Sequence, residues 1–223
     1  MLLDLSVALL MLRLFGKVGL YTVIVVSIIV CNIQVMKLVE LFGLTATLGN
    51  ILYASIFFST DVLGELYGKK EAKRGVWLGF TALVVTMVYM QIALRFHPAP
   101  GDFAQPALER IFDFLPRVVL ASICAYLLSQ FHDVWAFHFW KGVTNERHLW
   151  LRNNLSTAVS QFLDSFIFIT IAFYGTMPVL PLIIGQWIIK FAIGVLDTPV
   201  IYAVVWFLRK KESQVIQGDS LSA

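Results

Sequence analysis

Long apolar runs, separated by short polar intervals, constrain this chain more than any other feature. Six runs approach the ~20 residues that a helix needs to cross a bilayer. They cover about residues 19–39, 48–66, 75–96, 118–140, 154–174 and 182–208. Hydrophobic residues make up 59% of the chain and charged residues 14%, whereas soluble domains carry about 25% charged residues. The sequence therefore predicts an all-α membrane protein, one integral domain over residues 1–223 with six transmembrane helices.

Lysine and arginine cluster in alternate intervals between these runs. They are Arg13 and Lys17 before the first run, Lys69, Lys70, Lys73 and Arg74 after the second, Lys141, Arg147 and Arg152 after the fourth, and Arg209, Lys210 and Lys211 after the sixth. Because basic residues mark the cytoplasmic loops, this alternation predicts that both termini are cytoplasmic. Residues 2–15 are then an interfacial or pre-transmembrane segment, since a seventh span there would break the pattern.

The intervals on the other side are of two kinds. Residues 98–117 form the longest one, and their apolar residues recur at helical spacing, which predicts an amphipathic surface helix or lid. The segment LVELFGLTATLGN after the first run contains two glycines and two threonines and is compatible with a short or re-entrant piece.

Cys31 and Cys124 lie inside apolar runs, so we expect small buried side chains and no disulfide.

Charged residues within the runs cost at least ~2.5–3.5 kcal/mol each at a helix centre, so each is a candidate functional residue. They are Asp61, Glu65, Asp164, Lys190 and Asp197, and their uncharged companions are Asn32, Gln34, Gln91, Gln161 and Gln186. At ~1.5 Å of rise per residue, Asp61 lies about 12 Å above Lys69, and Asp164 and Asp197 each lie about 18 Å above the nearest basic anchor. These depths predict a polar layer at the middle of the bilayer.

Helical spacing indicates which of these side chains share a face. Asp61 and Glu65 are four residues apart, and so are Gln186 and Lys190, with Trp187 adjoining. An aromatic ring beside hydrogen-bonding groups suits a flat heterocycle. Two alternatives stay open: Lys190 neutralises Asp164 or Asp197 as a structural pair, and Glu65, only about 6 Å above Lys69, is a gate residue or an ion-pair partner.

Other residue patterns favour packing over chemistry. Gln34 and Gln91 are expected to join helices, and Gly75 with Gly79 allows two helices to approach closely. Cys124, His132 and His138 do not have the spacing of a metal site, so no metal is expected. An intramembrane aspartyl hydrolase would require Asp61 and Asp164 to share a proton, but the sequences around them differ from the motifs of such enzymes.

Three segments carry a resemblance to a known family. They are TDVLGELYGKKEAKR, RNNLSTAVSQFLDSFIFITIAF and KFAIGVLDTPVIY, at residues 60–74, 152–173 and 190–202. In these motifs and their positions the chain resembles the queuosine-precursor transporters, also described as vitamin-uptake-transporter-like. The resemblance implies a multi-pass protein of the bacterial inner membrane, with a fold similar to the substrate-binding subunits of energy-coupling-factor transporters. It also implies import of 7-cyano-7-deazaguanine, 7-aminomethyl-7-deazaguanine or queuine for tRNA modification.

The resemblance also implies roles for individual residues. The family's intramembrane polar positions correspond here to Asn32, Asp61, Gln161, Asp164 and Lys190, and its commoner variants to Glu65 and Asp197. A carboxylate can accept hydrogen bonds from N1–H and the 2-amino group of a 7-deazaguanine, an amide or ammonium can donate to O6, and Trp187, Phe57 or Tyr53 can stack on the ring.

The expected partners are the 7-deazaguanine substrate and the lipid bilayer, with no cofactor and no nucleic acid bound directly, and a homo-oligomer is left open. The alternatives are a vitamin-binding subunit that needs a separate ATPase module and, less favoured, the aspartyl hydrolase.

Overall fold

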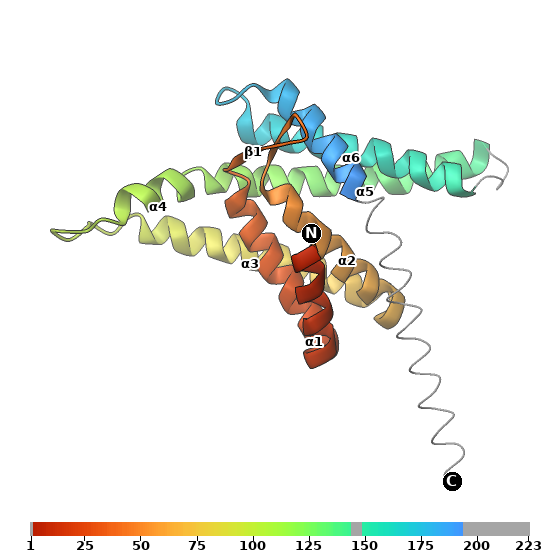
Figure 1. Cartoon of the computed structure of the whole chain (residues 1–223), viewed down its shortest axis with the longest axis horizontal. Helices are drawn as coiled ribbons and strands as arrows, with labels where there is room; N and C mark the ends of the chain where they lie inside the picture. Colours follow the sequence, from red (N-terminus) through yellow and green to blue (C-terminus); the bar gives the residue numbers. More distant parts are fainter. Residues whose placement is uncertain (1, 144–148, 194–223) are drawn as a thin grey trace, which may run out of the picture.

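The structure, a computed structural model, describes residues 2–143 and 149–193. This part of the chain is mostly helical (Figure 1). Its elements are α1 (Leu2–Gln34), β1 (Leu38–Leu41), β2 (Leu44–Thr47), α2 (Gly49–Tyr67), α3 (Lys69–Ala93), α4 (Gln105–Phe112), α5 (Leu115–Val143) and α6 (Leu149–Phe173). A further helix, Val179–Ile193, follows α6 and is called the terminal helix below.

Several of these helices have the length and composition of membrane spans. Within the described residues, three stretches are long and apolar enough to cross a bilayer: Leu3–Gln34, Lys69–Ala93 and Gln105–Ser129. Two shorter apolar helical stretches are Ala158–Phe173 and Val179–Ile193. Many large apolar side chains also point outward, among them Trp77, Tyr89 and Leu120, each more than half exposed. Outward apolar surface on long helices is what contact with lipid requires.

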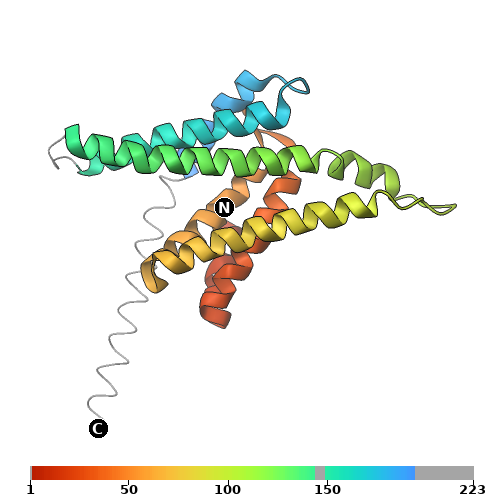
Figure 2. The same ribbon diagram turned by 180° about the vertical axis from the view of Figure 1, so that it is seen from behind.

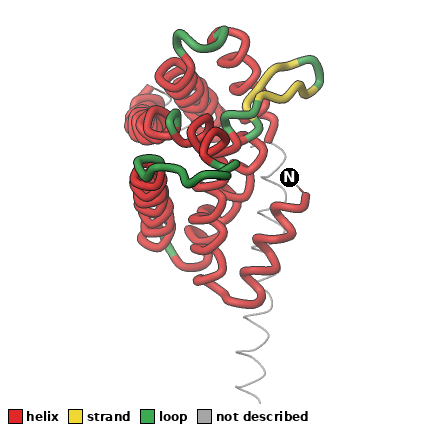
Figure 3. Tube along the Cα trace, turned by 90° about the vertical axis from the view of Figure 1, so that its left-hand side faces the viewer, coloured by secondary structure: helices red, strands yellow, loops and turns green. Residues whose placement is uncertain are grey.

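The expectation that the first span continues to Val39 is wrong. α1 ends at Gln34, and residues 38–47 form a β-hairpin in which Leu41 pairs with Leu44. Phe42 and Gly43 form its tip with φ of 53° and 76°, the left-handed pair that a two-residue hairpin turn needs. The chain is therefore not entirely α-helical, and the interval compatible with a short or re-entrant piece contains this hairpin (Figure 3).

The N-terminal end of α1 folds back on the rest of that helix. Gly16 breaks the helical geometry with φ 55° and ψ −133°, and the chain reverses there (Figures 1 and 3). Beyond the reversal, a Cβ placed on Gly19 would lie 2.0 Å from the carbonyl oxygen of Met11. Glycine at position 19 therefore allows the backbones of the two arms to touch, and residues 2–15 lie antiparallel to residues 17–34.

The described helices pack as two groups. One consists of α1, α2 and α3, and the other of α5, α6 and the terminal helix. The first group has its own hydrophobic cluster around Leu20, Ile24 and Leu63, and the second has a cluster around Ile169 and Phe173. From behind, α5 runs across the first group (Figure 2). Contacts of α5 with α1 and α3 join the two groups.

Hydrogen bonds and ion pairs fix both ends of the molecule. At one end Glu71 Oε2 binds Lys17 Nζ at 2.9 Å and accepts a hydrogen bond from the Tyr21 hydroxyl, which ties the start of α3 to α1. At the other end Gln91 Nε2 donates to the Phe112 carbonyl oxygen at 2.5 Å, joining α3 to α4 as expected for this glutamine. Arg117 donates to the carbonyl oxygens of Ile171 and Tyr174, at 2.6 Å each.

Candidate functional site

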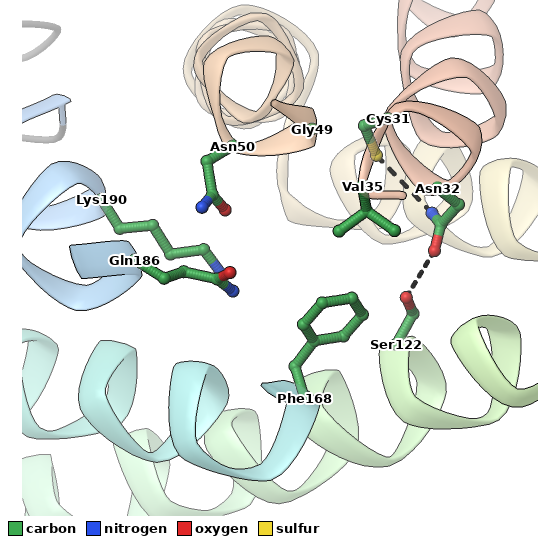
Figure 4. Close-up of a pocket in the computed structure, with 9 residues that line it drawn as sticks. All are labelled: Cys31, Asn32, Val35, Gly49, Asn50, Ser122, Phe168, Gln186 and Lys190. Atoms are coloured by element: carbon green, nitrogen blue, oxygen red, sulfur yellow. Dashed lines mark hydrogen bonds between the residues drawn. The ribbon is translucent and has the colours of Figure 1, made fainter. Parts of the chain in front are cut away.

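A small polar cavity lies where the two helix groups meet. α1 and α2 contribute one side of it, and α5, α6 and the terminal helix contribute the other (Figure 4). Its lining residues are Cys31, Asn32, Val35, Gly49, Asn50, Ser122, Phe168, Gln186 and Lys190. The cavity measures about 10 Å³, which is space for about one water molecule. A binding site shared by two packed groups of helices can open when those groups move apart.

A buried ion pair supplies the charge of this site. Lys190 is 5% exposed and forms an ion pair with the Asp164 carboxylate of α6. This is the structural pairing that helical spacing and depth left open for Lys190. Removing two charges from water costs several kcal/mol per ion, so each group requires the other while the cavity stays closed. A ligand that replaces one partner would have to offer similar polar contacts.

Asn32 joins α1 to α5 at the edge of the cavity. Its amide Nδ2 donates to the Ile28 carbonyl oxygen at 2.7 Å, and its Oδ1 accepts a hydrogen bond from the Ser122 hydroxyl (Figure 4). Both polar ends of the Asn32 carboxamide are thus occupied by the protein. The two helix groups share a hydrogen bond here, beside the cavity.

The β-hairpin borders the site through the terminal helix. Thr47 Oγ1, in β2, donates to Gln186 Oε1 at 3.3 Å. One residue earlier in the terminal helix, a Cβ on Gly185 would lie 2.1 Å from the Thr45 carbonyl oxygen. The strand and the helix therefore touch through backbone, and this contact places the base of the hairpin beside Gln186.

Asn50 enters the cavity from the first turn of α2. Its side chain is 2% exposed, and Nδ2 has no hydrogen-bond partner in the part of the chain that the structure describes. In Figure 4 the carboxamide points toward the head groups of Lys190 and Gln186. Asn50 was not among the residues expected at the site, because it stands at the edge of an apolar run beside Gly49.

Two further predicted site residues do not line the cavity. Trp187 Nε1 donates to the Ala158 carbonyl oxygen at 3.1 Å, and its ring meets Phe162 edge-on at 5.5 Å. Gln161 is half-buried, and its Oε1 is buried without a hydrogen-bond partner among the described residues. The aromatic ring that lines the cavity is instead Phe168, which sequence reasoning missed among the many phenylalanines.

Asp61 and Glu65 lie on the exposed face of α2. Phe57, Asp61 and Glu65 follow one another at four-residue spacing and are all exposed, whereas Phe58 and Val62 are buried. The two carboxylates share a face as expected, but that face is not the one lining the cavity. Asp197 and the side chain of Tyr53 lie outside the described residues. The structure thus brings together Asn32, Asp164 and Lys190, and adds Asn50, Ser122, Phe168 and Gln186.

The cavity lies closer to the hairpin end of the molecule than the predicted layer did. At ~1.5 Å per residue, Ser122, Phe168 and Gln186 lie about 7–11 Å from the ends of their helices at that side. Lys190 is deeper, about 16 Å from Val179. Depth measured from the basic anchors placed Asp164 about 18 Å above Arg152, near mid-bilayer, and Lys190 further toward the outer side; the cavity extends from Lys190 toward the hairpin.

Comparisons with known proteins identify relatives of this chain. A family model described as "Putative vitamin uptake transporter" matches residues 47–204. A Bacillus subtilis protein named "Probable queuosine precursor transporter" is 49% identical over 193 residues, which is 85% of this chain and 84% of that protein.

More distant relatives carry the same name or nearly the same name. A Haemophilus influenzae protein, also named "Probable queuosine precursor transporter", is 24% identical over 82% of this chain and 77% of its own length. An Escherichia coli protein named "Queuosine precursor transporter" is 28% identical over 64% of this chain and 62% of its own length. No solved structure matches. Because the family model covers most of the chain and the Bacillus protein matches it so extensively, the chain belongs to the queuosine precursor transporter family, a family of transporters and not of enzymes.

Proposed function

We propose that the protein imports queuosine precursors across the bacterial inner membrane. The observation that carries the proposal is a buried polar cavity between two helix groups in a chain of this transporter family. The cargo class is the 7-deazaguanines: 7-cyano-7-deazaguanine, 7-aminomethyl-7-deazaguanine or queuine. Such bases are flat and have hydrogen-bond donors and acceptors on one edge. A site that combines amide side chains, a carboxylate and an aromatic side chain can bind that edge and stack on the flat face.

The transporter crosses the membrane six times, with a fold like that of energy-coupling-factor substrate-binding subunits. Its spans are the second arm of α1, α2, α3, α5, α6 and the helix that begins at Val179. The pair of Lys17 with Glu71 supports this topology, because it holds the basic turns at Gly16 and Gly68 at one end of the molecule. Basic turns belong on the cytoplasmic side. The first span therefore starts on the cytoplasmic side. By the same rule, the basic residues that follow the sixth span are assigned to the cytoplasmic side.

Within the site, Asp164 accepts hydrogen bonds from N1–H and the 2-amino group of the base. Lys190, its partner in the closed cavity, holds that carboxylate in place, and Phe168 or Trp187 stacks on the ring. Asn32 holds the two helix groups beside the ligand, and Gln161 offers its buried oxygen to a donor of the base. Asp61 and Glu65 act outside the closed cavity: Glu65 at the cytoplasmic gate, and Asp61 on the path of the cargo. Asp197 contributes a further carboxylate to substrate binding, as the sequence predicts.

Substrate entry requires the cavity to expand. Pockets for small molecules usually enclose about 300–1,000 Å³, and the cavity between the helix groups measures about 10 Å³. The two groups must therefore separate on one side and then on the other, which is alternating access around a central site. Opening toward the hairpin side breaks two contacts: the backbone contact between the hairpin and Gly185, and the Asn32–Ser122 hydrogen bond.

Complementation tests the proposal. Cells unable to make queuosine but able to use its precursors receive the gene, each precursor is fed separately, and queuosine is measured in tRNA. We expect at least one precursor to restore the modification. Asp164→Asn is expected to reduce uptake strongly, because the substrate's two donors lose a charged acceptor, whereas Arg110→Gln, an exposed change on α4, is expected to leave it unchanged.

The same assay separates transport from the main alternative. The second candidate is a binding subunit that needs a separate ATPase module. The family model's description as a vitamin uptake transporter is the observation that favours this candidate. Uptake that persists in a strain without any such module supports a self-sufficient transporter, and uptake that disappears supports the subunit. If no precursor restores queuosine although the protein is present in the membrane, the proposed function is wrong.

A further inference from the structure

Asn50 differs from the other polar side chains that line the cavity. Asn32 is bonded at both ends of its carboxamide, Gln186 accepts from Thr47, and Lys190 binds Asp164. Asn50 is as deeply buried as these residues, yet its Nδ2 donor has no partner in the described part of the chain. A buried donor left without an acceptor costs free energy, and native proteins hold few of them.

The surroundings of Asn50 show what kind of group it can bind. It stands in the first turn of α2, where Leu48 at the N-cap makes no side-chain hydrogen bond to the helix. Backbone N–H groups at a helix start carry partial positive charge. Lys190 faces the same space and carries a full positive charge (Figure 4). This corner of the cavity is therefore rich in donors, and none of the described residues accepts a hydrogen bond from Nδ2.

We infer that Asn50 donates a hydrogen bond to the keto oxygen of the transported base and so selects keto bases over analogues that lack this oxygen. The inference rests on the proposed function and assigns one edge of the ligand. Asp164 receives the donors of the base, and Asn50, on the opposite helix group, binds its acceptor. A base held in this way joins the two groups, since α2 belongs to one and α6 to the other.

Binding measurements on the purified full-length protein in lipid nanodiscs test the inference. The ligands are 7-cyano-7-deazaguanine and its 6-thio analogue, in which sulfur, a weaker acceptor, replaces the keto oxygen while N1–H and the 2-amino group are kept. The variants are Asn50→Leu, which keeps the side-chain size, and Asn50→Ala, which avoids added branching. Ser59→Ala is the matched control, because Ser59 is a buried residue of α2 that does not line the cavity, and its hydroxyl has no partner among the residues that the structure describes.

We expect Asn50→Leu and Asn50→Ala to weaken binding of the keto base about tenfold, equivalent to ~1.4 kcal/mol, and to weaken binding of the thio analogue clearly less, because sulfur is a weak acceptor. The thermal stability of Asn50→Leu should equal or exceed that of the unmodified protein, because the change removes a donor that has no partner. Ser59→Ala should bind both ligands like the unmodified protein. Rescue by Asn50→Gln, which restores a donor on a longer arm, would support the assignment further.

Other results would overturn the inference. Equal weakening for both ligands, or unchanged binding of the keto base, would show that Asn50 does not contact that oxygen. A loss of thermal stability in both Asn50 variants would show a structural role instead. If the unmodified protein binds no 7-deazaguanine at all, the proposed function fails with it, and that outcome is distinct because it is seen before any substitution is made.

Discussion

At the scale of single residues, the sequence was a better guide to which polar groups lie within the apolar helices than to the direction in which their side chains point. Asp164 was expected in the mid-bilayer polar layer, with Lys190 as a cation that could neutralise either Asp164 or Asp197, and the structure pairs Lys190 with Asp164 at the cavity. Asp61 was expected in that layer too, but it lies on the exposed face of α2. Helical spacing shows which residues share a face. It does not show which face is internal when lipid-facing and protein-facing sides are both apolar.

The ion pair provides a prediction at this scale. Lys190→Met leaves the Asp164 carboxylate buried without its cation, which should lower the free energy of unfolding by about 3–5 kcal/mol. The double variant Lys190→Met/Asp164→Asn removes both charges and should recover most of that stability. Thermal unfolding in detergent measures both effects.

Uptake by the same variants separates packing from substrate contact. We expect the double variant to remain inactive in the complementation assay, because the carboxylate that receives the donors of the base is gone. If the double variant regains both stability and uptake, Lys190 and Asp164 serve the fold alone.

At the scale of elements, close helix packing followed directly from the sequence. Gly75 and Gly79 were expected to let two helices approach, and both are buried on α3 against α1. A Cβ on Gly79 would lie 2.2 Å from Ile28 Cδ1, and one on Gly75 would lie 2.9 Å from Ile24 Cδ1. The contact is tight enough that any side chain must displace a neighbour.

Gly79→Val should therefore separate α1 from α3. We expect a loss of stability of about 1–3 kcal/mol, the usual cost of overpacking a core, seen as a lower unfolding temperature and reduced yield of monodisperse protein. Gly64→Ala on α2 is the control, since its added Cβ would lie at an ordinary 3.9 Å from Ala72 Cβ. An unchanged unfolding temperature for Gly79→Val would contradict the packing seen between these helices.

The β-hairpin could not be placed from sequence. Residues 35–39 are apolar except for Lys37, so composition alone extends the first span to about Val39. The turn depends on positive φ at Phe42 as well as Gly43, and a phenylalanine gives no signal for that geometry because bulky residues rarely adopt it. The hairpin is also held by a tertiary contact with the terminal helix at Gly185, which no local pattern reports.

At the scale of the whole molecule, the two helix groups meet at the cavity lined by Asn32, Asn50 and Lys190. The sequence predicted the apolar helices and the alternation of basic turns, because these depend on bilayer thickness and on loop charge. It did not predict the division into two groups or the residues at their boundary. Asn50, Ser122 and Phe168 reach the cavity from three different helices, and only the packing of those helices brings them together.

Labelling of single cysteines tests the orientation of the molecule. Phe42→Cys, at the fully exposed hairpin tip, should react with a membrane-impermeant maleimide in intact spheroplasts. Lys70→Cys, in the basic turn before α3, should react only after permeabilisation. The unmodified protein is the blank, since Cys31 and Cys124 lie within helices. Labelling of Lys70→Cys in intact spheroplasts would mean that the protein is inserted the other way round.

The reversal at Gly16 also affects how the first residues reach their final place. Residues 2–15 extend about 20 Å back along the first span at 1.5 Å per residue, with Leu3, Val7, Leu10 and Leu14 facing outward. During synthesis these residues emerge before the helix against which they pack, so they can dock only after the first span has been inserted. A folded domain fused to residue 1 would oppose this docking, and a purification tag at the amino end should therefore be avoided.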